Sequence, residues 1–123
     1  MDWAGYFEKQ FSNRPWKIMF IEEALEDLQS LDASVVEQVA AGIVKVNQNP
    51  LPKRLGGYGN ELGKDRETGD LRPLLYIKYL DIGIRVIYGL EESGQQKIMK
   101  IIAVDLRAEK QAYRAAARRL AKA

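Results

Sequence analysis

Hydrophobic positions repeat with different periods along the chain, and each change of period predicts a new element. The run Trp16–Ile21 is short, apolar and rich in β-forming residues, so it predicts a strand. Apolar residues then recur at helical spacing between Ala24 and Leu31, and again between Val36 and Val46. Glu22, Glu23, Glu26 and Asp27 lie at other positions of the first stretch. The pattern therefore predicts an α-hairpin that is acidic outside and aliphatic inside.

The second of these helices leads into a segment of different composition. Ser34 and Glu37 have the spacing of a capping box and predict the start of the helix, and Asn49-Pro50 predicts its end. Residues 50–70 contain five glycines, two prolines and eight charged residues. Such a composition predicts a long loop and is typical of a mobile segment. Long loops inside a compact domain more often have a function than not.

Three strand-like runs follow, with short turn-forming segments between them: Leu71–Leu80, Ile84–Leu90 and Lys97–Val104. Such short connections predict an antiparallel meander. A segment rich in Ala, Arg and Lys then continues to Leu120 and predicts a C-terminal helix. We therefore expect an α+β domain, with an N-terminal strand and α-hairpin packed on an antiparallel β-meander sheet, a C-terminal helix, and all helices on one face of the sheet.

Residues 1–15 form an N-terminal extension to the single domain that we assign to residues 16–123. Trp3, Tyr6 and Phe7 fall on one helical face together with Phe11. This pattern fits either a short helix docked on the protein's own core or an arm that binds a partner, and we favour docking.

The residue types that are missing narrow the possible chemistry. The chain has 123 residues, which suits one domain, and contains neither His nor Cys. This excludes disulfides, thiol catalysis, cysteine-ligated zinc and a Ser-His-Asp triad. Any catalysis must use Lys, Arg, Tyr, Asp or Glu, and we expect no metal and no cofactor.

Positive charge is concentrated in the second part of the chain. Residues 1–50 carry 4 Lys or Arg and 8 Asp or Glu, a balance of −4, whereas residues 51–123 carry 15 and 9, a balance of +6. This asymmetry fits either an ordinary mixed-charge surface or a face that binds a polyanion such as nucleic acid. The sequence shows neither a secretory signal nor an apolar run long enough for a membrane span, so we expect a cytoplasmic protein.

Two cations are predicted to face each other across a hairpin. If Asp81-Ile82 forms a two-residue loop, Lys78 lies directly opposite Arg85 on the same face of the sheet. Like charges at such positions cost stability, so the pair indicates a bound anion. The alternatives are a three-residue loop or side chains that simply extend into water.

Further residues extend this cationic cluster. Arg107 follows the last strand, which lies beside the strand of Arg85, and Tyr113, Arg114, Arg118 and Arg119 come next in the C-terminal helix. A cluster of this kind can cleave RNA without a metal ion: the ribose 2′-OH attacks the adjacent phosphate, cations stabilise the developing charge, and an aromatic ring stacks a base.

The order of these features resembles the RelE/ParE superfamily of type II toxin–antitoxin toxins over roughly residues 16–120. The specific pieces are the strand Gly83-Ile84-Arg85-Val86-Ile87-Tyr88, then Val104 three residues before Arg107, then Tyr113 six residues after Arg107. In RelE-like members the resemblance implies cleavage of mRNA on the ribosome, and it places the active residues at Lys78, Arg85, Arg107 and Tyr113.

The same resemblance implies roles for the residues. Arg85 and Arg107 would bind phosphate, Tyr113 would stack a base or transfer a proton, and Lys78 would transfer a proton or stabilise charge. RelE-like members often carry a second lysine where this chain has Tyr76. We expect RNA contacts from Lys53, Arg54, Tyr76, Arg114 and Arg118.

The resemblance leaves more than one function open. A nuclease toxin would have an antitoxin, mRNA and the ribosome as partners. A ParE-like toxin would instead poison DNA gyrase without cutting RNA, and a third possibility is a non-catalytic regulatory module with the same fold. We favour the nuclease because the ParE branch generally lacks the full set of cations and tyrosine.

Overall fold

Five strands build the central sheet of the computed structural model, which describes residues 2–11, 14–65, 69–105 and 109–122. They are β1 (Trp16–Phe20), β2 (Asn60–Glu61), β5 (Leu75–Tyr79), β6 (Ile84–Ser93) and β7 (Gln96–Asp105). Their order across the sheet is β1-β7-β6-β5-β2. β1 runs parallel to β7, whereas the other neighbours are antiparallel. The expected meander of the last three strands and the expected α+β class are therefore confirmed.

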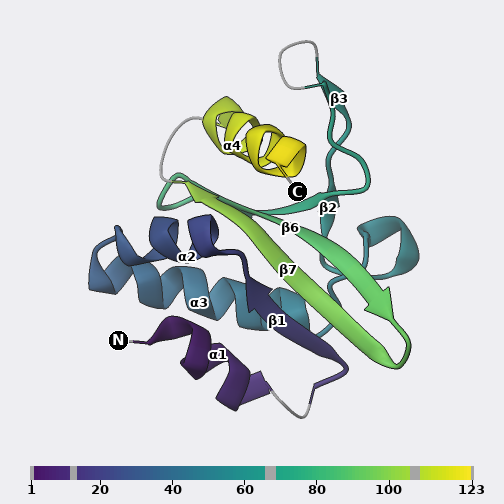
Figure 1. Ribbon diagram of the computed structural model, residues 1–123. Coiled ribbons are helices and arrows are strands. Elements are labelled where there is room, and N and C mark those ends of the chain that lie inside the picture. Colours follow the sequence, from purple (N-terminus) through teal and green to yellow (C-terminus); the bar gives the residue numbers. More distant parts are fainter. Residues whose placement is uncertain (1, 12–13, 66–68, 106–108, 123) are drawn as a thin grey trace.

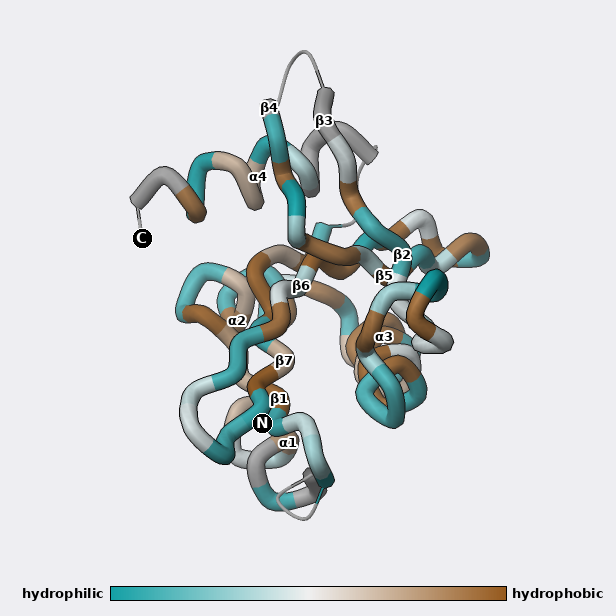
Figure 2. The backbone as a smooth tube through the Cα atoms, turned by 90° about the vertical axis from the view of Figure 1, so that its right-hand side faces the viewer, coloured by the Kyte–Doolittle hydropathy of each residue, from teal (hydrophilic) through white to brown (hydrophobic). Residues whose placement is uncertain are grey.

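Helices cover both faces of this sheet, which corrects the expectation of a single helical layer (Figure 1). α2 (Glu22–Gln29) and α3 (Ala33–Asn47) pack with α1 (Trp3–Phe11) on one side, here called the hairpin face. α4 (Glu109–Lys122) packs on the other side, the α4 face. Figure 2 shows the hydrophobic strands β5 and β6 between α4 and the two hairpin helices. Within the described ranges no helix is long and apolar enough to cross a membrane.

The β5–β6 hairpin has the register that the sequence predicts, with Lys78 opposite Arg85. The ends of the strands differ from the prediction. β5 begins at Leu75 rather than Leu71, and β6 continues to Ser93. Successive side chains of these strands point to opposite faces, so each strand packs against the helices on both faces of the sheet.

A β-bulge distinguishes the β6–β7 pair. Ile87 pairs with Ala103 and Tyr88 with Ile101, so Ile102 is the extra residue of β7. Ile102 and Ala103 both join the hydrophobic cluster of the α4 face. The bulge therefore gives this face two consecutive apolar side chains on which α4 packs.

The N-terminal helix docks on the protein's own core. Phe7 is fully buried, and its ring centroid lies 5.2 Å from that of Phe20 in β1. Trp3 and Tyr6 pack edge to face at 5.4 Å beside it. Of the two possibilities left open for this segment, docking is the one observed, and the side chain of Phe11 lies outside the described residues.

The two ends of α3, the second helix of the α-hairpin, differ in detail from the sequence prediction. α3 begins at Ala33 with Asp32 at its N-cap, so the capping box predicted from Ser34 and Glu37 is wrong. The helix ends at Asn47, whose buried Nδ2 donates a hydrogen bond of 2.9 Å to the carbonyl of Trp16. This bond fixes the end of α3 to the first strand of the sheet.

The described part of residues 50–70 is structured, which corrects the expectation of one long mobile loop. It contains the 3-10 turn η1 (Lys53–Leu55), β2, and the short antiparallel pair β3 (Lys64–Asp65) and β4 (Gly69–Asp70). The backbone N–H of Lys53 donates to the carbonyl of Gly59 at 2.9 Å. A Cβ at Gly59 would collide with the Tyr88 hydroxyl, which explains a glycine at this position.

Candidate functional site

The centre of the candidate site is a guanidinium group that contacts two aromatic rings on the α4 face, and these rings also contact each other. Cζ of Arg85 lies 5.1 Å from the ring centroid of Tyr76 and 5.9 Å from that of Tyr113. The two rings are themselves 6.1 Å apart in an edge-to-face arrangement. Such contacts are attractive because the negative face of an aromatic ring interacts with a cation.

Three elements bring these residues together. Tyr76 and Arg85 project from β5 and β6 to the α4 face, because each lies one position from a residue that points into the hairpin-side core. Tyr113 comes from the first half of α4 and points down onto the sheet, as does the fully buried Ala116 three residues later. Arg85 and Tyr113 are each 8% exposed, so the centre of the site is almost fully covered.

Lys78 and Asp105 complete a row of charges across the sheet. Arg85 is in register with Lys78 on β5 and with Asp105 on β7. Of the two opposed cations, Arg85 is buried in the protein and Lys78 is exposed to solvent. Sequence reasoning missed Asp105, although the β6–β7 hairpin places it beside Arg85, and its negative charge reduces the repulsion that the two cations alone would cause.

The remaining predicted site residues lie elsewhere. Arg107 lies outside the described residues. Arg114 and Arg118 are exposed on α4, one helical turn apart. They can extend a positive surface from the site along α4.

Lys53 and Arg54 are not brought to the Arg85 site. Both are exposed on η1, and Nε of Arg54 binds Oε1 of Glu61 at 2.8 Å. Glu61 pairs with Leu75, whose side chain belongs to the hairpin-side core. Arg54 is therefore bound to the edge of the sheet on the side away from Tyr76.

Arg119 differs most from its predicted role. The sequence groups it with the exposed arginines of the helix, but its side chain is only 16% exposed and forms an ion pair with Asp27 of α2 at 2.7 Å. The hydrogen bonds that Arg119 donates to Asp27 raise the pKa of Arg119. Because the partners are separated by 92 positions in the chain, no local pattern in the sequence signals this contact.

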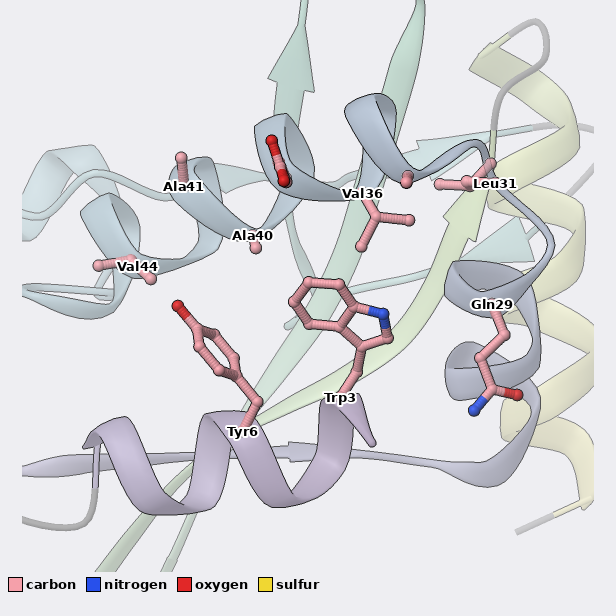
Figure 3. Close-up of a pocket in the computed structure, with 10 residues that line it drawn as sticks. Trp3, Tyr6, Gln29, Leu31, Val36, Ala40, Ala41 and Val44 are labelled. Atoms are coloured by element: carbon pink, nitrogen blue, oxygen red, sulfur yellow. The ribbon is translucent and has the colours of Figure 1, made fainter. Parts of the chain in front are cut away.

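A groove of about 880 Å³ lies on the other side of the molecule (Figure 3). Trp3 and Tyr6 of α1 face Val36, Ala40 and other residues of α3 across it. Its walls are mainly apolar and it lies on the hairpin side, apart from the cations of the α4 face. Among the described residues, no group of three or more His, Cys, Asp or Glu side chains is arranged to hold a metal ion.

Comparison with solved structures identifies the fold. A mutant of the Escherichia coli toxin RelE in the free state matches with a TM-score of 0.58 and 24% identity, covering 84% of this chain and 95% of that one. The isolated E. coli RelE toxin matches with a TM-score of 0.55 and 22% identity, covering 84% and 96%. RelE in the intact E. coli RelBE toxin–antitoxin complex matches with a TM-score of 0.54 and 24% identity, covering 75% and 95%.

Comparison of the sequence alone finds no match, either to a family model or to a curated protein. The structural matches nevertheless agree with one another over most of their length. The chain therefore has the RelE-like toxin fold, which confirms the resemblance inferred from the sequence.

Proposed function

We propose that the protein is the toxin of a type II toxin–antitoxin module and an endoribonuclease that cleaves mRNA on the ribosome without a metal ion. The observation that carries this proposal is the contact of the Arg85 guanidinium with the rings of Tyr76 and Tyr113, with Lys78 opposite it on the neighbouring strand and exposed. The RelE-like fold supports the same class of function.

The chemistry requires a cation for the phosphate and groups that move two protons. The 2′-oxygen of one nucleotide forms a bond to the adjacent phosphorus, and the bond from phosphorus to the 5′-oxygen of the next nucleotide breaks. One proton leaves the 2′-OH and one reaches the departing 5′-oxygen. Arg85 stabilises the charge on the phosphoryl oxygens, and a preorganised donor of this kind contributes about 100- to 1,000-fold to the rate.

The roles of the other residues follow from their surroundings. Lys78 is exposed beside Arg85 and can contact the phosphate or transfer a proton. Tyr76 and Tyr113 offer rings for base stacking, and the Tyr113 hydroxyl is a second candidate for proton transfer. Arg107 adds a second phosphate contact in this proposal. Arg114 and Arg118 would guide RNA along the exposed side of α4.

An antitoxin is the expected protein partner. RelE is found with its antitoxin in the RelBE complex and with an antitoxin peptide in a further structure. We propose a corresponding hetero-oligomer for this chain, in the cytoplasm, with mRNA and the ribosome as targets of the released toxin.

Primer extension on a translated message tests the proposal. Purified protein should produce discrete cleavage sites, and the double variant Arg85→Ala, Arg107→Ala should abolish them. Unchanged cleavage by this variant would refute the assignment of the site. A phosphorothioate at the scissile position tests the metal-free mechanism, and rescue of its cleavage by a thiophilic metal ion would contradict it.

The same reaction separates the nuclease from the alternatives. DNA breaks that depend on gyrase, with intact mRNA, would favour a ParE-like toxin. Normal growth on expression, combined with tight binding to the product of a neighbouring reading frame, would favour a non-catalytic module.

A further inference from the structure

An ion pair joins α2 to α4 beneath the candidate site. Nη1 of Arg119 lies 2.7 Å from Oδ2 of Asp27, and Nη2 lies 3.0 Å from Oδ1 of the same carboxylate. The contact is thus bidentate, and the side chains are only 16% and 24% exposed. A planar, partly buried pair of this geometry fixes orientation better than an exposed pair does.

The same two side chains also bind the backbone of β7 where it bulges. Nη1 of Arg119 donates to the carbonyl of Ile102 at 2.6 Å, and the N–H of Val104 donates to Oδ2 of Asp27 at 3.0 Å. β1 pairs with β7 only as far as Ile101, so backbone groups of β7 at and after the bulge that face away from β6 need other partners. Asp27 and Arg119 therefore join three elements, α2, β7 and α4, at one point.

The apolar contact of α4 with the sheet, as far as its side chains are described, is small. Of its described side chains, those buried against the sheet are Tyr113, Ala115 and Ala116. Alanines bury little apolar area, so the packing of α4 is weaker than that of a leucine-rich helix. Arg119 lies six residues after Tyr113, about 9 Å along the helix axis, so fixing one end of the helix fixes the other.

We propose that Asp27 and Arg119 are positioning residues for the candidate site: their contact seats α4 on the bulge of β7 and thereby holds Tyr113 over Arg85. The part of this inference that concerns cleavage rests on the proposed function. The part that concerns the position of Tyr113 does not, and it can be measured without RNA.

Nitration of tyrosine by tetranitromethane, mapped by mass spectrometry, measures that position directly. The chain supplies its own references, since Tyr58 is 46% exposed and Tyr88 is fully buried. In Asp27→Asn we expect Tyr113 to react about 10-fold faster, with Tyr58 unchanged and Tyr88 still protected. Arg119→Lys, which keeps the charge but loses the planar fork, should give an intermediate rate.

A matched control comes from another bidentate pair among the described residues. Arg72 binds Asp70 through Nε at 2.9 Å and Nη2 at 2.8 Å, but the residues are two positions apart and exposed. Asp70→Asn should leave the reactivity of Tyr113 unchanged. Faster nitration of Tyr88 together with Tyr113 in Asp27→Asn would show general loosening of the fold and overturn the proposal, as would an unchanged Tyr113.

Cleavage gives the second readout. If α4 acts by positioning Tyr113, Asp27→Asn should lower kcat about 10-fold and change KM less, because RNA binding at Lys78 and the exposed arginines does not need the pair. A faster reaction of Tyr113 with unchanged kcat would refute the positioning role. If the unmodified protein cuts no RNA, the proposed function fails, whereas the nitration result still decides whether the pair seats α4.

Discussion

The two faces of the sheet use tyrosine in opposite ways. On the hairpin face, the hydroxyl of Tyr88 donates to the carbonyl of Pro50 at 2.8 Å and that of Tyr79 to the carbonyl of Val39 at 2.7 Å. On the α4 face, the rings of Tyr76 and Tyr113 both contact the guanidinium of Arg85. The first pair donates to the backbone of the core, whereas the second pair contacts a buried cation whose neighbour Lys78 is exposed.

The hairpin face therefore provides most of the stability of the domain, whereas the α4 face carries the proposed active site. The hairpin face buries a large aliphatic cluster beneath three helices, and its buried tyrosines donate to backbone carbonyls. The α4 face has a smaller cluster under a single alanine-rich helix. Substitutions on the hairpin face should therefore act on stability, and substitutions on the α4 face should act mainly on activity.

The largest expected effect is the loss of activity in Arg85→Ala. Removing a preorganised cation from the phosphate site should lower the rate of mRNA cleavage about 100- to 1,000-fold. Some stability should also be lost, because the cation–π contacts disappear and Asp105 loses the cation that lies in register with it, but the variant should remain folded. Cleavage kinetics and urea unfolding followed by tryptophan fluorescence (Trp3 and Trp16) measure the two quantities. A strongly destabilised but active variant would contradict the division between the faces.

Alkaline pH should act on the hairpin face. Burial raises the pKa of Tyr79 and of Tyr88 above the ordinary value of about 10. Above pH 10 the unfolded chain releases these protons while the folded protein keeps them, so the free energy of unfolding falls as pH rises. The decrease is about 1.4 kcal/mol per pH unit for each tyrosine.

Urea titrations between pH 8 and 11 test this expectation. The double variant Tyr79→Phe, Tyr88→Phe should show a much flatter dependence, since neither position can then ionise. An equally steep loss in that variant would place the alkaline sensitivity elsewhere.

Tyr88→Phe should destabilise the protein at neutral pH by about 1–3 kcal/mol, because the buried carbonyl of Pro50 loses its donor. The melting temperature should fall by several degrees. Cleavage at a temperature where the variant remains folded should be unchanged, since Tyr88 lies on the face opposite Arg85. A parallel loss of activity would show that the two faces are coupled.

Local periodicity made much of this arrangement predictable. The alternation around Asp81-Ile82 predicted that Lys78 lies opposite Arg85, and the register confirms it. The fold class followed from the order of the periods, because a strand, an α-hairpin and a meander have few ways to pack. The contact between Tyr113 and Arg85 could not be predicted from periodicity, because it depends on which face of the sheet the last helix covers.

Contacts between distant segments could not be predicted in this way. The Asp27–Arg119 pair spans 92 positions, and the bulge at Ile102 that it supports depends on how β6 and β7 are paired. The glycines of residues 50–70 predict a flexible loop. At Gly59 the glycine instead allows close approach to Tyr88, which is visible only once β6 is in place.

The smallest expected effect on stability, and the sharpest test of the α4 face, comes from Tyr76→Leu. Leucine keeps an apolar side chain next to Arg85 but removes one of its two rings, a loss of about 0.5–1 kcal/mol in cation–π attraction. If Tyr76 also stacks a base, cleavage should fall by about 5- to 100-fold at this small cost in stability. Tyr76→Phe keeps the ring and should restore activity to within about twofold. Restoration by Phe but not by Leu would assign the effect to the ring, whereas equal loss in both would assign it to the hydroxyl and contradict stacking.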